Sequence, residues 1–249
     1  MALGIKLARA AIVVAIFALW EALSRSGIVN PRLLPAASDT LAMLGQLLQR
    51  ASVRNDLAVT ASEVLTAFAL AVPFGAMVGF LIAENRYFAE VVKPLLFFAF
   101  SIPKSIFLPM FILVFGVGFA QKVGFGFFST IFIVIMSTTT AVEQVKVEYL
   151  TVARSYGATS AQTALRVYLP SMLPVLLEAL RISMIFNLTG VILAEMYASR
   201  DGIGHQIASW GENFQMKQLL AGVVMIATIA IAFNEAVRWV ETRCSHWRT

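Results

Sequence analysis

The sequence of 249 residues contains very little cysteine and histidine. Cysteine occurs once, at Cys244, and histidine twice, at His205 and His246. A single cysteine excludes a disulfide within the chain and a cluster of thiolate metal ligands. The two histidines lie far apart in the sequence, so we expect no metal site and no cofactor.

Charged residues are also scarce. Asp, Glu, Lys and Arg together make up 13% of the chain, hydrophobic residues make up 59%, and the mean hydropathy is +0.81. Soluble domains carry about 25% charged residues, so this composition indicates a membrane protein. We interpret the formal net charge of +5 as cations that flank membrane spans at the cytoplasmic face, and we expect no nucleic-acid partner.

Two enzymatic signatures are missing from the sequence. There is no Gly-x-x-x-x-Gly-Lys-Ser/Thr phosphate loop, so we do not expect the chain to bind or hydrolyse ATP. There is also no Gly-x-Ser-x-Gly elbow, and no histidine lies within a predicted span, so an intramembrane hydrolase lacks support. We assign no catalytic residue.

Long apolar runs predict an all-α, polytopic membrane protein with about six transmembrane helices in a single domain, residues 1–249. A span needs about 20 apolar residues to cross the hydrocarbon layer. The expected spans are residues 8–23, 57–83, 91–115, 124–142, 170–196 and 218–240. The first run is short, and a signal peptide cleaved near Ser24 is the alternative. We favour an uncleaved helix because the later spans hold the chain in the membrane.

Several breaks and surface helices are expected between these spans. Residues 39–49 and 202–214 have the apolar spacing of amphipathic helices. The third span is interrupted at residues 101–105 and again at Pro109. In the second span, Gly75 and Gly79 form a small-residue face that favours close helix packing in lipid.

The distribution of cations favours a cytoplasmic N-terminus and C-terminus, since more of the lysines and arginines then lie inside. This orientation also places residues 143–169 in the cytoplasm. The cations expected outside are Arg25, Arg32, Arg50, Arg54, Lys122, Arg200 and Lys217.

Residues 143–169 form a polar connection that predicts two short helices outside the membrane. Ala153, Gly157 and Ala158 carry almost no side chain, which allows another surface to approach the backbone. Gly157 can take a positive φ and end a helix, and Thr159 or Ser160 can cap the next one. Pro170 suits the first turn of the following span. An ordinary solvated loop is the alternative.

This connection resembles the cytoplasmic loop of binding-protein-dependent ABC importer permeases. That pattern is Glu-Ala-Ala, three residues, Gly, nine residues, Ile-x-Leu-Pro. Ala153 stands at the second Ala, Gly157 at the Gly, and Val167, Leu169 and Pro170 at the final motif. Thr151 and Val152 depart from the Glu and the first Ala.

Further landmarks resemble the nitrate, sulfonate, taurine and pyrimidine branch of that family. They are Trp20-Glu21, Leu34-Pro35, Ile102-Pro103-Lys104 with Pro109, Phe115-Gly116-Val117-Gly118, Ala179-Leu180-Arg181, Ala194-Glu195 and Asp201-Gly202-Ile203-Gly204. The resemblance implies a permease of the bacterial inner membrane that works as two copies with two ATPase subunits. An external solute-binding protein would deliver a small solute. The loop residues that would couple to the ATPase are Thr151, Ala153, Arg154, Gly157, Ala158, Leu169 and Pro170.

Polar residues within the predicted spans are candidates for the translocation path, because charges in the bilayer are costly without a role. The candidates are Pro103, Lys104, Arg181, Asn187 and Glu195. The last four have a structural alternative: Lys104 bonded to freed carbonyls, Arg181 paired with Glu178, Asn187 as a contact between helices, and Glu195 as the end of a helix. The run at residues 137–140 can bond its own helix carbonyls, so we assign no site there.

A second class of function stays open on this evidence. An autonomous secondary transporter or channel would also use broken helices and charges within spans. Such a protein is expected to show an inverted repeat, and the Ala-x-x-x-Gly docking loop would be unexplained. On an importer path, the positive charge of Lys104 would favour an anionic solute.

Overall fold

The computed structural model describes residues 2–244 and is helical throughout its regular structure. The first half contains α1 Ala2–Arg25, α2 Ala37–Gln49, α3 Ala51–Glu84, α4 Arg86–Ser101, the 3₁₀ turn η1 Lys104–Phe107 and α5 Leu108–Phe115. The second half contains α6 Phe119–Glu143, α7 Val147–Ser155, α8 Ser160–Thr163, the π-helical turn η2 Ala164–Tyr168, α9 Leu169–Tyr197, α10 Ile203–Glu212 and α11 Met216–Cys244.

Among these residues, 5 helical segments are long and apolar enough to cross a membrane: Leu7–Arg25, Ala51–Glu84, Phe119–Glu143, Ser160–Tyr197 and Met216–Trp239. A sixth is obtained when α4 is counted together with η1 and α5, which are bent from it by 79°. The expected all-α membrane architecture is therefore confirmed. The interruption expected in the third span is this bend, at Pro103.

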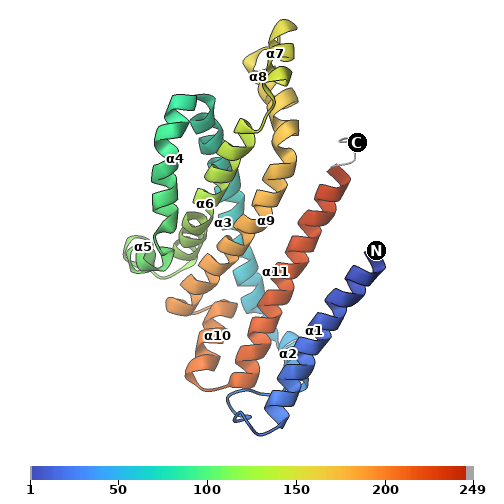
Figure 1. Cartoon of the computed structure of the whole chain (residues 1–249). Helices are drawn as coiled ribbons and strands as arrows, with labels where there is room; N and C mark the ends of the chain where they lie inside the picture. Colours follow the sequence, from blue (N-terminus) through green and yellow to red (C-terminus); the bar gives the residue numbers. More distant parts are fainter. Residues whose placement is uncertain (1, 245–249) are drawn as a thin grey trace.

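The core of the fold is formed by α3, α6 and α9, which lie side by side (Figure 1). The small-residue face predicted on α3 is where α6 approaches. A Cβ added at Gly75 would lie 2.9 Å from the Val134 side chain, and one at Gly79 would lie 2.6 Å from the Ile135 carbonyl oxygen. Because the helices already touch at these glycines, a larger residue would force α3 away from α6.

A buried ion pair crosses this core. Lys122 Nζ of α6 lies 2.6 Å from Glu63 Oε1 of α3, and the two side chains are only 4% and 1% exposed. Lys122, expected as one of the outer cations, is therefore buried in the core of the bundle. The lysine lies one turn inside α6, which begins at Phe119 and not near residue 124. Its charge neutralises a carboxylate that would otherwise be buried alone.

The amphipathic helix α10 is fastened to the ends of α3 and α9. Glu195, fully buried in the last turns of α9, accepts hydrogen bonds from Thr60 Oγ1 at 2.6 Å and from the Gly204 amide at 2.7 Å. Asp56 of α3 accepts from the Gly202 amide at 3.1 Å and from Gln206 Nε2 at 2.8 Å. These carboxylates bind amides at the start of α10, where the helix dipole favours negative charge.

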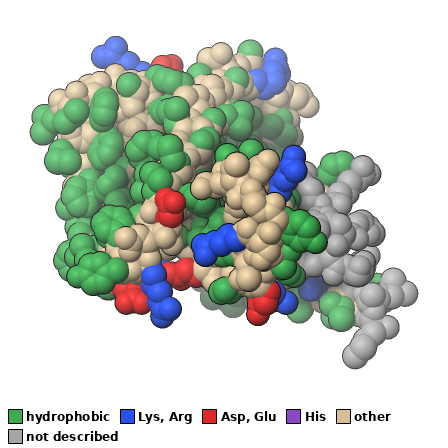
Figure 2. Space-filling model, turned by 90° about the horizontal axis from the view of Figure 1, so that it is seen from above, with side chains coloured by type: hydrophobic (Ala, Val, Ile, Leu, Met, Phe, Trp, Pro, Cys, Tyr) green, Lys and Arg blue, Asp and Glu red, His purple; other side chains and the backbone are tan. Residues whose placement is uncertain are grey.

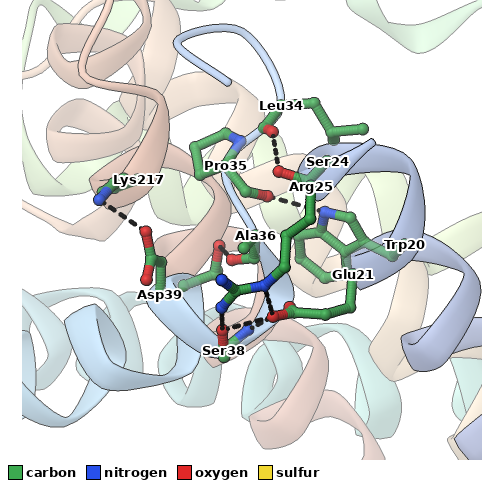
Figure 3. Close-up of polar contacts among 11 residues, drawn as sticks. Trp20, Glu21, Ser24, Arg25, Leu34, Pro35, Ala36, Ser38, Asp39 and Lys217 are labelled. Carbon is green, nitrogen blue, oxygen red and sulfur yellow. Dashed lines mark hydrogen bonds and ion pairs between the residues drawn. The ribbon is translucent and has the colours of Figure 1, made fainter. Parts of the chain in front are cut away.

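Helix α1 stands apart from the bundle and is held at its C-terminal end by α2 and the preceding loop (Figures 1 and 3). Trp20 Nε1 donates to the Pro35 carbonyl at 2.9 Å, and Ser24 Oγ donates to the Leu34 carbonyl at 2.7 Å. Glu21 accepts from the Ser38 amide at 3.0 Å. Because Ala36 has no side chain to cap α2, Glu21 caps that helix from outside.

Candidate functional site

The polar connection between α6 and α9 forms a helical hairpin that projects from one end of the bundle (Figure 1). Helix α7 ends at Ser155, and Gly157 just beyond it has a φ of +71°. The Gly157 amide donates to the Arg154 carbonyl at 2.9 Å, and the Ala158 amide donates to the Ala153 carbonyl at 3.0 Å. This is the Schellman arrangement, in which a left-handed residue ends a helix. The helix end occurs where the sequence places it.

The second helix of the hairpin begins with a capping box. Thr159 Oγ1 accepts from the Gln162 amide at 3.3 Å, and Gln162 Oε1 accepts from the Thr159 amide at 2.9 Å. Helix α8 then runs through the π-helical turn into α9. The turn is explained by Pro170, which lacks the amide that would continue the ladder. Pro170 lies in the first turn of α9, as expected.

The outer surface of α7 is unusually apolar for a segment in water. Tyr156 is 88% exposed and Val147 is 71% exposed, and Val152 is also exposed. A Cβ added at Gly157 would meet no atom within 4 Å. Glycine is therefore needed here for its backbone conformation, and the space beside it is open to another molecule. Thr151 and Leu169 are exposed on the same hairpin.

A second surface of the hairpin faces the bundle. A groove of about 270 Å³ separates the hairpin from the end of α3. Arg154 and Ala158 from the hairpin line it, opposite Glu84 and Phe80 of α3. Arg154 therefore faces the bundle side of the hairpin as well as solvent. Figure 2, viewed from this end, shows charged side chains scattered over it, as expected for a surface in water.

Lys104 lies at the bend between α4 and α5. Its Nζ donates to the Phe100 carbonyl at 3.4 Å and lies 4.1 Å from the centre of the Phe100 ring. The rings of Phe132 and Phe186 are 5.8 and 5.9 Å away. The side chain is half-buried. The bond to Phe100 is long and occupies one of three ammonium donors, so the aromatic box holds the cation without saturating it.

A trough runs along the same three helices, toward the hairpin. We call it the inner trough; it has a volume of about 370 Å³ and lies between α4, α6 and α9. Its lining residues are Lys93, Leu96, Phe97, Met136, Ser137, Thr139, Thr140, Val175, Glu178, Ala179 and Ile182. Hydroxyl and charged groups thus share it with apolar side chains.

The aromatic box continues the inner trough by one helical turn. Phe100 follows Leu96 by four residues on α4, Phe132 precedes Met136 by four on α6, and Phe186 follows Ile182 by four on α9. Residues four apart lie on one face of a helix. Lys104 therefore stands at one end of the trough, and the ion pair between Lys93 and Glu143 stands at the other.

The other path candidates are placed differently. Pro103 is exposed and begins η1, and Arg181 is half-buried on α9 near the trough residues Glu178 and Ile182. Asn187 is fully buried, and its Nδ2 donates to the Val64 carbonyl of α3 at 2.7 Å. Glu195 lies beneath α10. The polar side chains of Asn187 and Glu195 thus both form hydrogen bonds within the core.

The sequence matches the family described as "Binding-protein-dependent transport system inner membrane component" over residues 71–246. The chain belongs to this family. The permease is 27% identical over 233 residues to the taurine transport system permease protein TauC of Escherichia coli K12, covering 92% of this chain and 85% of the relative. It is 24% identical over 233 residues to the putative aliphatic sulfonates transport permease protein SsuC of Bacillus subtilis 168, covering 94% and 84%.

A solved structure shares the fold of the permease. The MetNI methionine ABC transporter, in an inward-facing conformation, matches with a TM-score of 0.65 and 20% identity, covering 80% of this chain and 96% of that one. The resemblance stated from sequence motifs is thus confirmed. The chain is a permease subunit of an ATP-driven, binding-protein-dependent importer of the inner membrane.

Sequence reasoning missed several residues of the permease that the fold brings together. Ser137 and Thr140 line the inner trough, although residues 137–140 were assigned no site. Thr139 and Thr140 do bond their own helix carbonyls, at 2.9 Å each, as expected. Lys93 and Glu178 are 85 residues apart in the sequence, and only the packing of α4 and α9 on α6 shows that they share a trough.

Proposed function

We propose that two copies of this permease form the path of an importer for a small organic or inorganic anion. The observation that carries the proposal is the position of Lys104 at the bend of a broken span, at one end of the inner trough. In this proposal, the second copy faces the trough and encloses it. Pro103 keeps the bend open, and Arg181 adds a further cation near the trough.

An anion is the solute that this arrangement fits. Lys104 lies among three phenylalanine rings, and in such low-dielectric surroundings an ion pair is stronger than in water. Its remaining ammonium donors are available to an acceptor oxygen. The relatives named for taurine and aliphatic sulfonates support a sulfonate or a similar anion. Asn187 and Glu195 are structural in this proposal, since their polar atoms bond inside the core.

In this proposal, the conformational change of a partner ATPase is transmitted to the path through the α7–α8 hairpin. We propose that the apolar surface of α7, the open space at Gly157 and the adjoining Ala158 seat in a groove of a partner ATPase, which hydrolyses the ATP. Thr151, Ala153, Arg154, Leu169 and Pro170 hold or flank this contact. The hairpin, the start of α1 and the end of α11 point the same way in Figure 1, which supports cytoplasmic termini. An external binding protein would deliver the solute at the opposite face.

The charge of Lys104 is tested by two substitutions in the assembled transporter. Lys104→Gln keeps the hydrogen-bonding capacity and removes the charge, while Lys104→Arg keeps the charge. Uptake of the native anion is expected to fall far more with Gln than with Arg, with assembly unchanged. Lys217→Gln serves as the control, because Lys217 is half-exposed and pairs with Asp39 away from the trough. Normal uptake by Lys104→Gln would make this lysine structural and remove the anion assignment.

A further inference from the structure

Three charged groups from three helices lie in or beside the part of the inner trough nearest the hairpin. Lys93 of α4 is ion-paired with Glu143, the last residue of α6. Glu178 of α9 lines the same trough as Lys93. Among the ion pairs between described residues, none involves Glu178. Lys93 is therefore paired with one carboxylate beside the trough and shares the trough lining with a second.

The two carboxylates differ in what a bond to Lys93 would do. In the present conformation the Lys93–Glu143 pair joins α4 to the end of α6, beside the trough. A bond from Lys93 to Glu178 would instead join α4 to α9 across the trough, because those two residues contribute to its lining from different helices. The second pairing would thus bridge the trough, whereas the first does not.

Of these three charged groups, Glu143 lies closest to the hairpin in the chain. Only residues 144–146 separate it from the start of α7 at Val147. Within this connection, Val145 is buried and packs in one cluster with Ala141 and Val142 of α6 and Met172 of α9, with Leu150 of α7 against it. A packed connection transmits a displacement instead of absorbing it as a loose loop would. Movement of α7 therefore shifts Glu143.

We propose that Lys93 is a positioning residue that exchanges Glu143 for Glu178 when the hairpin moves, and that this exchange closes the inner end of the trough. The inference rests on the proposed path and adds the residues that gate it. Half-exposed groups suit such an exchange: the Lys93 and Glu143 side chains are 30% and 43% exposed, so water assists the transfer. A deeply buried pair such as Glu63–Lys122 would resist it.

The test uses the full transporter with its ATPase and a single reporter cysteine. Cys244→Ser removes the native thiol, and Ser137→Cys places a new one in the trough lining. A membrane-impermeant maleimide is added at the hairpin face of proteoliposomes, first without nucleotide and then after trapping with ATP and vanadate. In the parent, trapping is expected to slow labelling by about tenfold, the factor that a modest free-energy difference between two states produces.

In Glu178→Gln, labelling is expected to stay fast in both states, because the closed pairing is lost. Inverting all three charges, with Lys93→Glu, Glu143→Lys and Glu178→Lys, is expected to restore protection. A merely structural role would not predict this rescue. Glu90→Gln is the matched control, since Glu90 lies on α4 in an exposed pair with Arg86. Full protection in Glu178→Gln, or failure of the assembled triple variant to regain it, would overturn the exchange. If the parent transports normally in either case, the proposed path stands without this gate.

Discussion

At the scale of single residues, glycine is required at position 157 for its backbone conformation, and not because a larger side chain would lack space. Its φ of +71° costs a non-glycine residue about 1–2 kcal/mol, and the penalty is greatest for a β-branched side chain. Gly157→Val is therefore expected to abolish uptake with insertion intact. Gly157→Asn, which tolerates this conformation, should keep more activity than Val. Uptake and ATPase activity of the reconstituted transporter measure both.

The matched control for this prediction is Gly45→Val. Gly45 lies on α2 with open space around an added Cβ and without a positive φ. Valine should be tolerated there, because neither conformation nor packing opposes it. Wild-type uptake by Gly157→Val would contradict the assignment of this residue to coupling.

The Glu63–Lys122 pair predicts a strong asymmetry between single and double substitutions. Lys122→Met alone leaves a buried carboxylate unpaired, which costs about 3–5 kcal/mol. Adding Glu63→Gln removes the buried charge that Lys122→Met leaves unpaired, so the double variant should recover part of the lost stability. The melting temperature of the detergent-purified transporter measures this coupling in a double-mutant cycle. Additive losses would show that the two side chains do not interact.

Gly157 and Lys122 show which features of the structure the sequence can predict and which it cannot. The helix end at Gly157 follows from local chain chemistry, and a sequence window of about ten residues carries it. The burial of Lys122 depends on a partner 59 residues away on another helix. Hydropathy places a lone lysine near the start of a span outside the membrane, since nothing local identifies its partner.

At the scale of elements, the attachment of α1 depends on a few hydrogen bonds to the loop before α2 (Figure 3). Trp20→Phe keeps the ring packing and removes the bond to the Pro35 carbonyl, which contributes about 1 kcal/mol. Amide hydrogen exchange at residues 36–39 is expected to become faster. Thr189→Val provides the comparison, because it removes one side-chain hydrogen bond, to the Ile185 carbonyl at 2.8 Å, on an exposed part of α9. Unchanged exchange in Trp20→Phe would show that α1 is held by other contacts.

The sequence largely predicted which helices exist, but it did not predict how they bend and pack. The spans follow from apolar length, and Pro103 and Pro109 indicate the broken third span. The 79° bend that results depends on how α5 packs against α6, through Phe111 and Phe125 among others. The π-helical turn before Pro170 also escaped prediction, since a proline at a helix start predicts a clean beginning and not continuity with α8.

At the scale of the whole molecule, the inner trough and the α7–α8 hairpin are connected through α6 and α9. Helix α6 lines the trough and leads through residues 144–146 into α7, and α9 returns from the hairpin to line the opposite wall. The sequence motifs identified the hairpin and the family. They did not reveal the trough, because its polar residues are spread over three helices that only the fold assembles.

The absence of a phosphate loop predicts that the permease alone does not bind nucleotide. Titration of ATP into the purified chain should show no saturable binding at micromolar concentrations. Addition of the partner ATPase should bring nucleotide binding to the complex at one ATPase subunit per permease chain. Saturable binding by the isolated chain would contradict this division of labour.

We propose that this chain forms a path that an ATPase drives through the α7–α8 hairpin. Uptake of the solute into proteoliposomes tests it most directly, with the permease reconstituted with and without its ATPase, ATP and binding protein. Uptake is expected only with all components present, and it should be lost in Ala153→Asp, where bulk and charge enter the docking surface. Uptake by the permease alone, without ATPase or ATP, would contradict the account and identify an autonomous transporter or channel.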